Sequence, residues 1–287
     1  MSEKQPQIEI PCSELPIEQQ ANFEGSWTNL MCERLRNPEI RKQVIDLIWE
    51  QELVIQEELK KIREEGQKIE RTLITRQEME NNFEKVLDSV ERDTPVFFGK
   101  TMPNANGQVG EEEKKKLKEG ERYDKDREIM NLDWIFPDTN NKLTAEQWNI
   151  TESHEKGHVL RRYSGRCFSE KFLKAFDLNT IKVSESEFEE WMNVHPSAHK
   201  KPKSTEDLEK MYKNYLNNPK ELAERMSQLK NYFGMSGIDK FSKEHLAYAR
   251  EHYIKDTDFD NMMTKFFQAI TPEKEDAFIE LINSAGI

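Results

Sequence analysis

Residues 151–160 read TESHEKGHVL and place two histidines four positions apart, with a glutamate directly after the first. On an α-helix, residues four apart lie one turn apart on the same face, so His154 and His158 can direct both imidazoles at one point. Neutral imidazole is a preferred ligand of Zn²⁺, and a catalytic zinc takes three protein ligands and keeps one position for water. Glu155 lies beside this pair, where its carboxylate can take a proton from the water and pass it to a leaving amine. The spacing therefore predicts a hydrolytic zinc site.

The residues before the motif predict the helix that this geometry requires. Thr144 and Gln147 have capping-box spacing, so a helix is expected from about Ala145 through the motif to Tyr163. Gly157 lowers helix propensity by about 1 kcal/mol, and its presence inside the helix indicates close packing at that position. The structural alternative is a pair of polar histidines on an exposed helix face.

HEKGH resembles the HExxH signature of the zincin metallopeptidases, and the run TESHEKGHVLRRY resembles the active-site helix of compact zincin-like proteins from bacterial and phage-type genomes. The resemblance implies that His154 and His158 bind zinc and that Glu155 is the general base. It covers only this run and a few residues near Glu221. The third histidine of metzincins is absent from the following residues, VLRRYSGRCFSE. The resemblance therefore implies a gluzincin-like site, with a carboxylate ligand on a later helix.

Several residues compete to be that third ligand. Glu221, in the run NPKELAERM, is the expected one, because compact zincins carry a similar acidic helix downstream of the motif. Glu224 lies one turn further along and is the first alternative, as ligand or as a neighbour of the ligands. His195 and His199 are also four apart, but the surrounding residues predict a loop, and Asp177 is a more distant candidate.

The first third of the chain has a different pattern from the motif region. Residues 1–36 begin with several prolines among polar residues and predict an extended N-terminal arm. Asn37 and Pro38 are typical of a helix start, and an apolar stripe follows from Val44 to Leu73. TRQE at 75–78 predicts a second helix from about Arg76. Residues 37–93 are thus expected to form a long helical hairpin, whose apolar face we expect to pack on the rest of the protein.

The remainder divides into a charged segment and a second helical region. Residues 94–126 combine glycines and prolines with a run of alternating charge blocks, which predicts an exposed linker. Residues 127–287 repeat helical spacing and are expected to form a zincin-like metallopeptidase domain. The fold class predicted from these patterns is mainly α, with at most a small β element.

Composition narrows the class of partner and the compartment. The net charge is −12, and this disfavours nucleic acid, because phosphate binding needs a basic surface. The three cysteines, Cys12, Cys32 and Cys167, form no disulfide or metal-binding pattern. Neither a signal peptide nor an apolar run of membrane-spanning length is present in the sequence. We therefore expect a cytoplasmic protein without membrane or nucleic-acid partners.

Three functions are compatible with these patterns. The first is a zinc-dependent metallopeptidase that acts on a protein or peptide substrate. The second is a non-catalytic helical assembly or virion-type interaction protein with a degenerate zincin fold, which binds a protein partner through its N-terminal helices. The third is an enzyme whose metal-activated water attacks a group other than a peptide. Convergence of His154, His158 and a carboxylate within metal-binding distance separates the first two.

Overall fold

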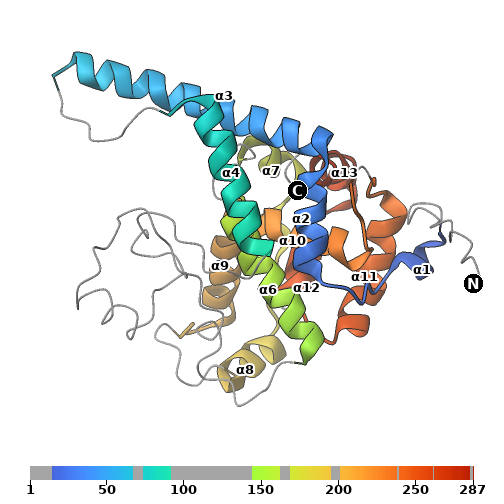
Figure 1. The fold of residues 1–287 in the computed structure, drawn as a ribbon. Coiled ribbons are helices and arrows are strands. Elements are labelled where there is room, and N and C mark those ends of the chain that lie inside the picture. Colours follow the sequence, from blue (N-terminus) through green and yellow to red (C-terminus); the bar gives the residue numbers. More distant parts are fainter. Residues whose placement is uncertain are drawn as a thin grey trace, which may run out of the picture.

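The computed structural model describes residues 15–66, 74–91, 144–161, 169–194, 201–237, 239–260, 262–284 and 287. Within these ranges the chain forms helices and no strand, as the sequence predicts for a mainly α fold (Figure 1). None of the helices in the described ranges is long and apolar enough to cross a membrane. The predicted charged linker at 94–126 and the end of the apolar stripe, at residues 69 and 73, lie outside the described residues.

Helix α10 (Pro219–Tyr232) lies at the centre of the structure and is buried from Leu222 onward. Its start follows from local signals, since Asn218 accepts a hydrogen bond from the backbone N–H of Lys220 and Pro219 occupies the first turn. Helices α2 (Trp27–Arg36), α6 (Ala145–Leu160), α7 (Ser169–Ala175) and α9 (Thr205–Leu216) pack against it. A helix covered on all sides in this way can hold side chains in fixed positions.

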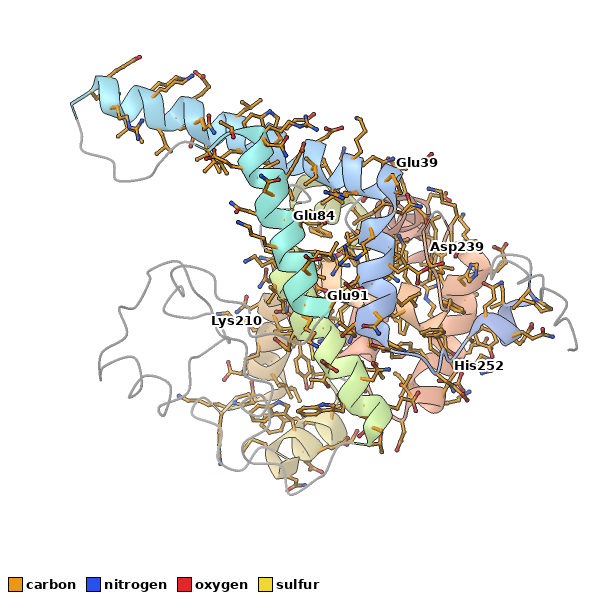
Figure 2. All side chains as sticks on the ribbon, in the orientation of Figure 1. Glu39, Glu84, Glu91, Lys210, Asp239 and His252 are labelled. Atoms are coloured by element: carbon orange, nitrogen blue, oxygen red, sulfur yellow. The ribbon has the colours of Figure 1, made fainter. Side chains whose placement is uncertain are left out.

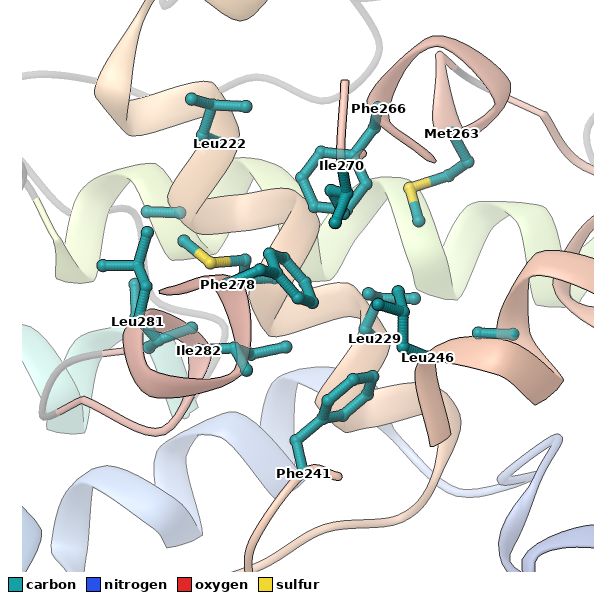
Figure 3. Close-up of a cluster of buried hydrophobic side chains, with 14 of the residues drawn as sticks. Leu222, Leu229, Phe241, Leu246, Met263, Phe266, Ile270, Phe278, Leu281 and Ile282 are labelled. Carbon is teal, nitrogen blue, oxygen red and sulfur yellow. The ribbon is translucent and has the colours of Figure 1, made fainter. Parts of the chain in front are cut away.

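The C-terminal helices supply most of the apolar core around α10. They are α11 (Lys243–Thr257), α12 (Met263–Gln268) and α13 (Glu275–Ile282). Figure 3 shows Leu229 of α10 among Phe241, Leu246 and Phe278 from this part of the chain. The same part of the chain also contains α8 (Glu185–Val194) and the short 3₁₀ turns η4 (Leu178–Thr180) and η5 (Pro272–Lys274).

A second apolar cluster joins α2 to α3 (Pro38–Glu64) and α4 (Arg76–Glu91). It consists of Met31, Cys32, Leu35, Val44, Ile45, Ile48, Met79, Phe83, Val86, Leu87, Val90 and Leu160. Leu160 is the last residue of α6, so this cluster packs directly against the helix that carries the histidines. For α4 and the inner half of α3, the apolar face therefore packs on the rest of the protein, as the sequence predicts.

The prediction of an extended arm over residues 1–36 is wrong for its described second half. Residues 15–36 contain α1 (Ile17–Gln20) and α2, and Ser26 caps α2 by accepting a hydrogen bond from the N–H of Asn29. The reason is tertiary burial, because Trp27, Met31 and Leu35 form a stripe at four-residue spacing that is almost completely buried. The prolines that suggested an arm all precede this stripe.

Helices α3 and α4 begin where the sequence predicts, but they do not pack against each other along their whole length. The backbone carbonyl of Ile74 accepts a hydrogen bond from Gln56 at 2.8 Å, so α4 starts beside the middle of α3. The outer half of α3 extends away from the other helices (Figure 1). The stripe residues Ile55, Leu59 and Ile62 are only partly buried there, and Leu53 and Val54, which lie outside the stripe, are 44% and 60% exposed. The stripe is therefore fully buried only in the inner half of the helix.

Candidate metal site

Helix α6 carries both histidines and begins with the predicted capping box. The Thr144 hydroxyl accepts from the N–H of Gln147 at 3.2 Å, and the Gln147 side chain accepts from the N–H of Thr144 at 3.1 Å. The helix then continues without a break through His154 and His158. The two imidazole rings meet edge to face, with their centroids 4.7 Å apart.

Glu221 completes a group of three candidate ligands from the first turn of α10. Its Oε2 lies 3.2 Å from Nε2 of His154, and its Oε1 lies 3.3 Å from Nε2 of His158. One ligand atom from each residue can be chosen so that all three lie within 4.8 Å of one another. His154 is 4% exposed, Glu221 14% and His158 22%, so the group is mostly shielded but open on the His158 side. The structure thus brings together the three residues predicted as ligands.

The two separations are compatible with a tetrahedral metal. Two ligand atoms about 2.0–2.1 Å from Zn²⁺ in a tetrahedral site lie about 3.3 Å apart. Nε2 of each histidine lies at about this distance from a different oxygen of Glu221, a distance that an ordinary hydrogen bond also allows. Two imidazoles and a carboxylate are also a donor set that zinc favours. His154, His158 and Glu221 therefore fit this metal.

Several buried side-chain atoms near the group have no hydrogen-bond partner. They include Nδ1 of His154, Nδ1 of His158, Oε1 of Glu224 and Nε of Arg225. In each histidine the nitrogen that faces Glu221 is Nε2, and Nδ1 is the nitrogen without a partner.

The electrostatics of the three residues leave a negative carboxylate facing imidazole nitrogens. Burial lowers the pKa of His154 to about 3, with a further contribution from the positive charge of Arg225. Burial also opposes protonation of His158, but the bond to Glu221 and its charge outweigh this effect and raise the pKa of His158. Burial favours protonation of Glu221, yet its bonds to the two histidines hold its pKa well below the usual range. His154 is therefore held neutral, the form that binds a metal.

Glu155, the predicted general base, lies on α6 directly after the first histidine. Its side chain is partly buried, and this burial raises the pKa of its carboxyl group. The charges of Glu221 and Glu224 act in the same direction, whereas that of His158 opposes them. Glu155 is not one of the three grouped ligands, as its predicted role requires.

Glu224, the first alternative ligand, is committed to another partner. Its Oε2 accepts a hydrogen bond from Nη1 of Arg161 at 2.6 Å, and both side chains are nearly fully buried. The carboxylate also lies directly over Gly157, where an added Cβ atom would stand only 1.7 Å from Oε2. Gly157 is therefore required for close packing, as the sequence indicated, and the packing is against α10.

The Arg161–Glu224 pair belongs to a larger buried network. Nη2 of Arg161 donates to the Ser227 hydroxyl at 2.8 Å, and the same hydroxyl accepts from Nη2 of Arg34 at 3.1 Å. Nη1 of Arg34 donates to the carbonyl of Met235 at 2.8 Å. The network thus joins α6, α10 and α2 directly beneath the candidate site.

Buried Arg225 and half-buried Tyr215 form a second hydrogen-bonded pair near Glu221. Nη2 of Arg225 donates to the Tyr215 hydroxyl at 3.2 Å, and its Nη1 donates to Oε1 of Gln228 at 3.0 Å. Burial raises the pKa of Tyr215, and the charge of Glu221 raises it further. This arrangement brings a guanidinium and a neutral hydroxyl close to the candidate ligand.

The other candidates do not join the group. Asp177 caps η4, where its carboxylate accepts from the N–H of Asn179 at 3.0 Å. His195 and His199 lie outside the described residues. Sequence reasoning missed Arg161 and Arg225, although helical spacing places them three and four residues after His158 and Glu221. That spacing was a usable signal for both.

Comparison of the chain with protein-family models, curated proteins and solved structures gives no match. The resemblance to zincins consequently rests on the HEKGH run and the residues near Glu221.

Proposed function

We propose that the chain is a zinc-dependent metallopeptidase in which His154, His158 and Glu221 hold Zn²⁺. The observation that carries the proposal is the convergence of two imidazoles and a carboxylate from two helices, with one ligand atom of each within 4.8 Å of the others. The choice of a peptide bond as substrate is supported by the resemblance of HEKGH to the zincin signature, which is an argument by analogy.

Glu155 is the general base of the proposed reaction. Bound zinc supplies Lewis acidity, which polarises a substrate carbonyl and lowers the pKa of a water. The Glu155 carboxylate takes a proton from that water and then donates it to the leaving amine, so the residue ends the cycle ionised as it began. His158 lies at the more open side of the group, so we expect substrate to approach there.

Metal analysis of three variants tests the proposal. Protein prepared without chelator is expected to contain one zinc per chain, and the double variant His154→Ala/His158→Ala is expected to contain none. Glu155→Gln should keep the zinc and lose hydrolysis of a mixed peptide library by about 10²–10⁴-fold, as for removal of a general base. His252→Ala, an exposed histidine on α11, is the matched control and should change neither quantity.

A wild-type protein without bound metal would overturn the proposal. A Glu155→Gln variant as active as the wild type would overturn the role of Glu155 and leave the ligands in place.

A second function is favoured by the outer half of α3. Leu53 and Val54 are exposed on this projecting helix and offer apolar surface to a protein partner. In that case the chain is a non-catalytic assembly protein, and a metal at His154 and His158 is structural. Stoichiometric zinc in a protein with no hydrolytic activity on peptides would favour this function.

A further inference from the structure

We infer that Arg161 and Glu224 are positioning residues, which fix the register of α6 against α10 and thereby bring Glu221 to the two histidines. The inference rests on the metal site of the proposed function. Each residue lies one turn after a candidate ligand, Arg161 after His158 and Glu224 after Glu221. Their 2.6 Å hydrogen bond therefore joins the same two helices one turn further along than the candidate ligands do.

The contacts of Arg161 restrict the two helices more than one bond would. Its guanidinium donates through Nη1 to Glu224 and through Nη2 to Ser227, and both acceptors belong to α10. A planar guanidinium holds two such acceptors in a fixed orientation. Gly157 allows the helices to approach until the Glu224 carboxylate lies over the backbone of α6.

Metal binding is sensitive to the register of α10 against α6. A shift of α10 by one residue moves its side chains by about 1.5 Å along the helix axis. Metal–ligand distances tolerate only about 0.2 Å. A shift that an apolar core can absorb is therefore enough to remove Glu221 from the metal, so the pair affects metal affinity more than it affects folding.

The double variant Arg161→Met/Glu224→Leu separates positioning from stability. Apolar replacement of a whole buried ion pair is often neutral or stabilising, so a merely structural pair predicts unchanged zinc affinity. A positioning pair predicts that zinc affinity, measured by competition with a fluorescent chelator, falls about 10–100-fold while the helical circular dichroism is retained. The visible absorption of the Co²⁺-substituted protein should change as well, because it reports coordination geometry.

Asp256→Asn is the matched control, because Asp256 on α11 contacts the other end of the same central helix. It alters the 2.5 Å hydrogen bond from the Tyr232 hydroxyl, which joins α10 to α11 away from the site. It should lower the midpoint of unfolding and leave zinc affinity and the Co²⁺ spectrum unchanged. Equal loss of affinity in this control would show that general destabilisation is the cause and would overturn the inference.

The remaining outcomes separate this inference from the proposed function. If the wild type binds zinc and the double variant binds it equally well, the positioning role is overturned and the metal site stands. If the wild type binds no zinc, both are overturned. If the double variant fails to fold, Arg161→Lys replaces it in the test. Lysine keeps the positive charge but loses the paired hydrogen bonds to Glu224 and Ser227. The variant should fold and bind zinc more weakly, and unchanged affinity in this variant would overturn the inference.

Discussion

The crossing of α6 and α10 and the outer half of α3 use charged residues in opposite ways. At the crossing, Arg161 and Glu224 are 2% and 1% exposed and make a direct hydrogen bond. Along α3 and the start of α4, ion pairs such as Lys60–Glu57 and Arg76–Glu80 lie at the surface. Figure 2 shows further acidic residues, Glu84 and Glu91, following one another down α4.

The difference separates charges that keep the surface of the protein hydrated from charges that hold two helices in a fixed orientation. Surface ion pairs contribute little to stability because water and salt screen them. A buried pair loses its hydration on folding and has no net stabilising effect unless its geometry is good. A chain with 55 acidic residues has many ways to be soluble, so burial of Glu224 needs a separate cause. The register of the candidate ligands is such a cause.

The largest expected effect is the loss of one partner of the buried pair. Arg161→Met leaves the Glu224 carboxylate buried beside Gly157 without its cation, which costs about 3–5 kcal/mol of unfolding free energy. Urea unfolding followed by circular dichroism measures this loss. The matched control, Arg76→Met, removes an exposed arginine and should leave the urea midpoint nearly unchanged. Equal losses in the two variants would abolish the distinction between the regions.

The two halves of α3 should respond differently to the same kind of truncation. Ile48→Ala removes a side chain that is 4% exposed, and we expect a loss of about 3 kcal/mol because a cavity forms. Leu53→Ala removes a side chain that is 44% exposed, and we expect a change within about 0.5 kcal/mol. Parallel urea titrations compare them. A large loss for Leu53→Ala would mean that the outer half of the helix is covered in solution.

Gly157→Ala tests the contact between the two crossing helices. The added methyl group overlaps Oε2 of Glu224, and overpacking of this kind costs about 2 kcal/mol. In a Glu224→Ala background the overlap with the carboxylate is gone, so most of that cost should disappear. A double-mutant cycle by thermal unfolding measures the coupling. Additive effects in the cycle would contradict the packing described here.

The smallest effect concerns acid stability through His245. Its Nδ1 accepts from the N–H of Ser242 at 3.1 Å, its Nε2 faces Oε1 of Gln20 at 3.1 Å, and burial lowers its pKa below the ordinary 6.5. The unfolded chain takes up a proton near pH 6.5 while the folded chain resists it, so stability is lost as the pH falls below that value.

His245→Gln keeps the capping-box pattern and removes the titrating group. The variant should lose less stability than the wild type between about pH 7 and pH 5, as measured by urea midpoints. His252→Gln, at a partly exposed histidine of the same helix, is the matched control. Identical pH slopes for all three proteins would show that His245 contributes nothing.

Local signals predicted most of the helices, because caps and prolines act within a few residues. Thr144 with Gln147, Asn37 with Pro38 and Asn218 with Pro219 each mark a helix start that the structure contains. The helix α2 was missed because its stripe is short and its stability comes from distant partners. The exposed outer half of α3 was missed for the converse reason, since periodicity shows which face is apolar but not whether anything covers it.

The residues of the candidate site also fall into those that local patterns predict and those that depend on tertiary packing. The pairing of His154 and His158 follows from helical spacing alone, so it was predictable. Glu221 was selected by resemblance, since spacing cannot choose among so many acidic residues. The partnership of Arg161 with Glu224 depends on where two helices cross. No pattern within either helix determines that crossing.

The hydrogen bonds of Arg34 and Trp27 have a consequence for the order in which the chain can fold. Trp27 donates its backbone N–H to Asn149, and Arg34 donates to the carbonyl of Met235, 201 residues further along the chain. A ribosome adds about 5–20 residues per second, so α2 waits roughly 10–40 s for the last of these partners. Met31 and Leu35 of α2 can pack on α3 and α4 well before then, whereas Arg34 finds its backbone partner only once Met235 has been made. The buried network beneath the candidate metal site is therefore completed only after α10 has been synthesised.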